Sequence, residues 1–134
     1  MQVILSDHNC EGQAKAIVDV LIRQETWLEL APLQLQWFRH VNLPISANDE
    51  AVWQFCQTHR YLLLTGNRST DDGGKSLEFT ARRLITSTSL PVLTIGNLKR
   101  VPADPLYREQ CVYRLANIVA DLDRYLGVMR LFLP

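Results

Sequence analysis

The feature that most constrains the fold of this chain is a regular alternation between short apolar runs and segments with helical spacing. Val3–Leu5 opens the chain as a run of apolar and β-branched residues, which is typical of a buried strand. From about Glu11, apolar side chains recur three and four positions apart, which predicts an amphipathic helix. The first part of the chain therefore predicts a strand followed by a helix.

The same alternation continues through the middle of the chain. Apolar and polar residues alternate from Leu33 to Trp37, which predicts a second strand that continues toward Val41. A helix with Asn48 or Asp49 as its N-cap is predicted to end near His59. A third strand is predicted at 61–65, and the turn-forming residues of 66–74 predict a long loop without regular structure.

The last third of the chain repeats the pattern once more. Apolar spacing predicts a helix around 77–85, a strand at 92–95, and a final helix from Pro105 to Gly127. The apolar tail 128–133 either covers a dimer or partner surface or packs against its own sheet. Strands and helices in this order predict one three-layer α/β/α domain over residues 1–134, with a parallel sheet of four or slightly more strands.

Composition excludes several classes of protein. The chain is 47% hydrophobic, and its 14 basic and 14 acidic side chains cancel, so a polyanion must be met by a local basic patch. The absence of a run of eighteen apolar residues and of a signal-like start predicts a cytoplasmic protein that does not contact a membrane. The three cysteines are widely spaced, which predicts reduced thiols in a core.

Carboxylates cluster in the sequence where a parallel sheet places its ligand site, beyond the carboxyl ends of the strands. Asp7 follows the first strand, Asp49 and Glu50 begin the second helix, and Asp71 and Asp72 lie in the loop after the third strand. Carboxylates and water hold Mg²⁺ or Mn²⁺, and such an ion can activate water and stabilise charge on a phosphodiester. The sequence therefore predicts a candidate metal site at this edge.

The order of these motifs resembles small bacterial PIN-like proteins, a family of metal-dependent ribonucleases that includes toxins of toxin–antitoxin systems. The resemblance implies that Asp7 and Asp49 are catalytic metal ligands for Mg²⁺ or Mn²⁺, with Glu50 as the alternative to Asp49. Where the family reads threonine, any residue, aspartate, this chain has Thr65, Gly66 and Asn67. Asn67 offers only a neutral carbonyl.

Completion of the metal shell is left open among Asn67, Asp71 and Asp72. The resemblance also implies RNA as the substrate, and a small antitoxin-like protein or a second copy of the chain as a partner. Phosphate contacts are expected from four basic residues in or after the loop, namely Arg68, Lys75, Arg82 and Arg83.

Two other functions fit the same sequence. A PIN-like protein that has lost its metal could serve as a binding or assembly module, and the asparagine at 67 motivates this alternative. The chain could also be a nucleotide-binding P-loop-like protein, because the segment 69–76 ends like a phosphate-binding P-loop, although Ser69 stands in place of the first glycine and two aspartates lie inside the cradle.

Structural roles compete with these functional ones. Asp7 and Asp49 suit turns or helix caps, and Asp71 and Asp72 suit a solvated turn. We expect a structural role for His8, because strand alternation would place its side chain on the face opposite to that of Asp7. The three tryptophans lie among apolar periodic residues and are expected in the core or at an interface.

Overall fold

The computed structural model describes residues 1–66 and 72–134, with residues 72–76 described as helical backbone only. A five-stranded, all-parallel sheet has the order β2-β1-β3-β4-β5. The strands are β1 (Gln2–Ser6), β2 (Leu33–Gln36), β3 (Leu62–Gly66), β4 (Val92–Ile95) and β5 (Arg130–Leu133). The helices are α1 (Glu11–Ile22), α2 (Glu25–Leu30), α3 (Asp49–His59), α4 (Asp72–Leu84), α5 (Arg100–Ala103) and α6 (Pro105–Ala120), with 3₁₀ turns η1 (His8–Cys10), η2 (Phe38–Val41) and η3 (Leu122–Tyr125).

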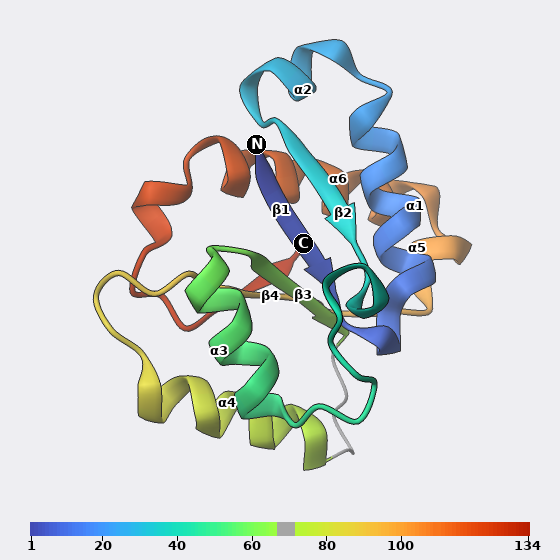
Figure 1. Ribbon diagram of the computed structural model, residues 1–134. Helices are drawn as coiled ribbons and strands as arrows, with labels where there is room; N and C mark the ends of the chain where they lie inside the picture. The colour runs from blue at the N-terminus through green and yellow to red at the C-terminus, as the bar shows by residue number, and fades with distance from the viewer. Residues whose placement is uncertain (67–71) are drawn as a thin grey trace.

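Helices cover both faces of the sheet, so the predicted three-layer α/β/α fold is confirmed (Figure 1). Side chains alternate between the two faces along each strand. In β3, Leu62 and Leu64 pack with α1 and α6, whereas Leu63 packs with α3 and α4. Each face therefore has its own apolar core, and a strand that supplies both cores must be apolar throughout.

Sequence periodicity located the main elements correctly and misplaced three boundaries. The second strand ends at Gln36 and does not reach Val41. The Nδ1 atom of His40 accepts a hydrogen bond of 2.9 Å from the backbone N–H of Trp37, which closes the 3₁₀ turn η2 where the strand was expected to continue. The short helix α2 was not predicted.

The long loop predicted at 66–74 is also wrong in part, because α4 already begins at Asp72. Residues 67–71 lie outside the described part of the chain. An aspartate in the first turn of a helix is favoured by the helix dipole. Gly73 and Gly74, which suggested a loop in the sequence, lie inside α4 and do not prevent the helix from forming there.

The final helix ends at Ala120, seven residues before the predicted stop at Gly127. Gly127 has φ +84 and its α-carbon faces the backbone of Ser87, so it forms a tight turn between η3 and β5. The apolar tail then pairs with β4 as the parallel edge strand β5. Packing against its own sheet is therefore the role that the structure shows for this tail.

Two further findings bear on the general expectations. All three cysteines are buried free thiols, as predicted. Among the described residues, no helix is both long and apolar enough to cross a membrane.

Candidate functional site

The chain adds strands first on one side of β1 and then on the other, and this change of side marks the expected ligand site. From β1 the chain first adds β2 on one side and then crosses back to add β3 on the other. In doubly wound sheets of order 2-1-3-4-5, ligands bind beyond the carboxyl ends of the strands at this β1/β3 junction. Asp7 directly follows β1 at that point.

Hydrogen bonds hold the Asp7 carboxylate in a defined position. Its Oδ2 accepts a hydrogen bond of 3.0 Å from the Thr65 hydroxyl at the end of β3, and its backbone N–H donates to the carbonyl of Leu64 over 2.8 Å. The side chain is 21% exposed. The carboxylate is thus oriented by the protein and still reachable from solvent.

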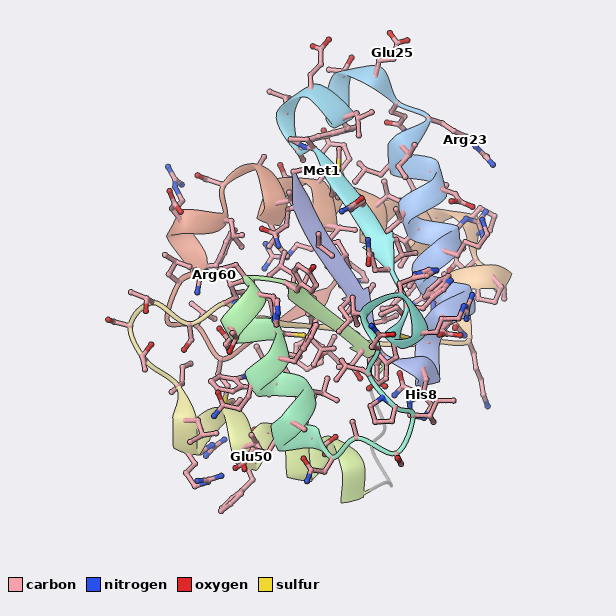
Figure 2. All side chains as sticks on the ribbon, in the orientation of Figure 1. Met1, His8, Arg23, Glu25, Glu50 and Arg60 are labelled. Atoms are coloured by element: carbon pink, nitrogen blue, oxygen red, sulfur yellow. The ribbon has the colours of Figure 1, made fainter. Side chains whose placement is uncertain are left out.

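His8 lies beside Asp7, contrary to the expectation from strand alternation. Its Nδ1 is 3.1 Å from Asp7 Oδ1, and its ring meets that of Phe38 edge-on; Figure 2 labels His8. Alternation does not apply because the strand ends at Ser6 and His8 begins the 3₁₀ turn η1. The histidine is therefore a neighbour of the candidate site that sequence reasoning placed on the wrong face.

Asn9 connects the ends of β1 and β3. Its Oδ1 accepts a hydrogen bond of 3.2 Å from the backbone N–H of Gly66, and its Nδ2 lies 3.5 Å from the Thr65 hydroxyl. A Cβ atom at Gly66 would lie only 2.5 Å from a methyl carbon of Leu98, so glycine leaves room for the Leu98 side chain against the end of β3. Asn9 is a site residue that the sequence analysis did not single out, and Thr65 was named there only as part of the family motif.

Cys56 on α3 is close enough to Asp7 for its charge to matter. Burial, and to a smaller extent the negative charge of Asp7, raise the pKa of the Cys56 thiol to about 12. The thiol therefore stays protonated at neutral pH and is no nucleophile.

The acidic start of α3 divides into two different environments. Asn48 is the N-cap, as predicted, and its Oδ1 accepts a hydrogen bond of 2.8 Å from the Ala51 N–H. Asp49 is the first helical residue and partly buried. Glu50 forms an ion pair with Arg83 of α4 and is half exposed (Figure 2). Glu50 thus takes part in a half-exposed ion pair that would compete with metal binding by this residue.

The remaining predicted residues lie on or before α4. Asn67, Arg68 and Asp71 fall outside the described residues, as does the start of the P-loop-like segment, residues 69–71. Asp72 begins α4 and Lys75 lies in its first turns, where only the backbone is described. Arg82 pairs with Glu78 at the other end of the helix, about 15 Å along the axis from Asp72 at 1.5 Å per residue.

A polar row crosses the sheet beside the candidate site. Thr65 pairs with Thr94 in the register of β3 and β4, so Asp7, Thr65 and Thr94 occupy neighbouring positions on the α3–α4 face. Thr94 is 1% exposed. Among the described residues, its hydroxyl is the buried side-chain atom that has no hydrogen-bond partner.

We expect Thr94→Val and Thr65→Val to change stability in opposite directions. Valine at 94 removes a buried hydroxyl without a partner and should raise the free energy of unfolding by about 1 kcal/mol. Valine at 65 removes a donor to a carboxylate and should lower it by roughly 1.5–3 kcal/mol. Urea unfolding of both variants measures this, and a loss of stability in Thr94→Val would show that its hydroxyl has a partner.

Among the described residues, no three His, Cys, Asp or Glu side chains are close enough together to hold a metal ion. Any metal shell at Asp7 must therefore draw on the segment 67–72 or on Asp49 and water. Comparisons with protein-family models, with curated proteins and with solved structures gave no match.

Proposed function

We propose that this chain is a PIN-like ribonuclease that depends on a divalent metal held at the Asp7 edge of the sheet. The observation that carries the proposal is the Asp7 carboxylate at the β1/β3 junction, with one oxygen fixed by the Thr65 hydroxyl and the side chain open to solvent. A carboxylate is the ligand that Mg²⁺ and Mn²⁺ prefer, and this position is where doubly wound sheets bind ligands.

The donor set available to the metal is composed of oxygen atoms. Asp7 would be joined by Asp49 from α3 and by Asn67, Asp71 or Asp72 from the segment after β3. Such a set fits a hard cation and does not fit zinc in a thiolate site. When bound, the metal would supply an activated water and a positive charge beside an RNA phosphodiester.

Hydrogen bonds and contacts from neighbouring residues orient the groups of this site. Thr65 orients the Asp7 carboxylate from one side, and His8 contacts its other oxygen. Asn9 fixes the backbone of Gly66, from which the segment toward Asn67 departs. Support of this kind keeps ligands within the narrow geometry that a metal requires. Arg68 and Lys75 are the basic residues that would lie nearest along the chain to a bound phosphate.

A metal-free PIN-like binding module is the second candidate. The Glu50–Arg83 ion pair favours it, because it occupies one of the acids that the first candidate could use. In that case a small antitoxin-like protein or a second copy of the chain would be the partner. Mg²⁺ and Mn²⁺ would then have no role.

Cleavage of RNA with and without metal tests the proposal. We expect a single-stranded RNA to be cut in the presence of Mn²⁺ or Mg²⁺ and to remain intact when EDTA is added, because the metal supplies the nucleophilic water. A DNA strand of the same sequence tests for RNA as the substrate. RNA that stays intact at every metal concentration would overturn the nuclease and leave the binding module.

A further inference from the structure

A hollow in the protein surface lies at the opposite edge of the sheet from Asp7. It has a volume of about 230 Å³ and lies between α3, the end of α4 and the segment 86–89 that leads into β4. Trp53 and Leu84 form an apolar wall, while Arg60, Thr86, Thr88 and Ser89 provide polar atoms. Because α3 ends and β4 begins near it, the hollow lies at the amino ends of the strands.

Arg60 stands in a backbone position that usually belongs to glycine. It follows the last residue of α3 with φ 58, and its own N–H and that of Tyr61 donate to the carbonyls of Gln57 and Cys56. This pattern is the Schellman motif, whose left-handed residue is most often glycine because a side chain is strained there. Because this residue is an arginine and not a glycine, a charged side chain lines the hollow at the end of α3.

The exposed guanidinium of Arg60 reaches the other side of the hollow. Its Nη1 donates a hydrogen bond of 2.9 Å to the carbonyl of Thr88, and the Arg60 carbonyl accepts one of 2.9 Å from Gln2 Nε2. A guanidinium has five N–H donors in a fixed fork. One bond to Thr88 leaves others for a ligand. Figure 2 shows Arg60 at the end of α3, away from His8 at the other edge of the sheet.

Three hydroxyl groups face one another on the other wall. The Thr86 oxygen lies 3.2 Å from that of Ser89 and 3.3 Å from that of Thr88. Backbone N–H groups of Thr86 and Thr88 donate to two of these oxygens. Two contacts between three hydroxyls use two of their protons, so one O–H proton remains for another acceptor. Ser89 is 5% exposed, which holds the group in place.

We propose that this hollow binds a phosphate group, with the Arg60 guanidinium as its charged partner and the one O–H proton left free among Thr86, Thr88 and Ser89 as a further donor. None of the described residues that line the hollow is acidic. A single fixed cation among neutral donors favours an oxyanion. A water molecule occupies about 30 Å³ in the liquid, so the hollow has room for a phosphate and several waters.

Titration followed by amide NMR tests this site. Inorganic phosphate is added to the whole protein at constant ionic strength, since nonspecific charge effects depend on salt. We expect saturable shifts of the 86–89 amides and of the Trp53 indole N–H. Arg60→Gln should weaken binding about tenfold to a hundredfold, the range expected for a hydrogen bond to a charged group.

Matched variants and ligands make the result decisive. Arg23→Gln removes an exposed arginine at the end of α1, at a distance from Arg60 (Figure 2), and should leave binding unchanged. Arg60→Gly suits the left-handed backbone position, so it keeps the fold while removing the charge. Repeating the titration with 5′-AMP distinguishes a free phosphate from that of a nucleotide. Shifts that do not saturate with either ligand, or equal binding by Arg60→Gly, would overturn the proposal.

Discussion

Leu64→Ala is expected to lower the free energy of unfolding by roughly 2–5 kcal/mol, the range for removing a buried leucine side chain. Leu64 is fully buried in the central strand β3, and its side chain packs in the core shared with α1 and α6. Neighbours on a sheet cannot move inward to fill the space without breaking their pairing. The cavity should therefore persist.

A loss of that size is a large fraction of the stability of a domain of this length, which is typically about 5–15 kcal/mol. Urea unfolding followed by far-UV circular dichroism measures this loss as a shift of the midpoint urea concentration, provided that the dependence of the unfolding free energy on urea is unchanged. Leu106→Ala is the matched control, because Leu106 is 65% exposed on α6. It should change stability by no more than about 0.5 kcal/mol. Similar midpoints for the two variants would contradict the described core.

The order of strands and helices was predictable because periodicity reports burial. The runs that became β1, β3 and β4 are mostly apolar, as is typical of strands buried on both faces, and α1 and α6 show one apolar face. What periodicity does not report is a local hydrogen bond. The His40–Trp37 bond that ends β2 and the turn at Gly127 each depend on one atom or one backbone angle.

The sequence predicted at which edge of the sheet the candidate site lies, but not most of the contacts within it. Asp7 could be found because it follows the first apolar run, and parallel strands bring their carboxyl ends to one edge. The contacts that His8, Asn9 and Thr65 make at the site were not predicted, since they depend on the 3₁₀ turn and on the β1–β3 register. Hydroxyl and amide residues at a strand exit carry no sequence signal that separates them from ordinary turn residues.

Asp7→Asn is expected to remove Mn²⁺ binding while leaving the fold intact. Asparagine has the same shape as aspartate, and its carbonyl can still accept the hydrogen bond from Thr65. The substitution replaces a charged oxygen by a neutral one, which a hard cation binds weakly. Loss of affinity should exceed the roughly 10–100-fold that removal of an outer-shell partner costs.

Calorimetric titration of Mn²⁺ into the wild type and the variant measures this difference, with thermal unfolding as the test of the fold. Asp123→Asn is the control, because Asp123 is exposed in η3, which follows α6 near the amino ends of the strands. It should bind Mn²⁺ like the wild type. Asp49→Asn and Glu50→Gln then identify the second ligand as the residue whose substitution lowers the affinity for Mn²⁺.

Each outcome separates the two candidate functions. Binding that is lost in Asp7→Asn and retained in Asp123→Asn would place the metal at the β1/β3 junction, where the Thr65 hydroxyl holds the carboxylate. Binding that survives Asp7→Asn would contradict the ligand assignment. A wild type that binds neither Mn²⁺ nor Mg²⁺ would leave Asp7 as a structural link between two strand ends, and the edge would then serve a protein partner and not RNA.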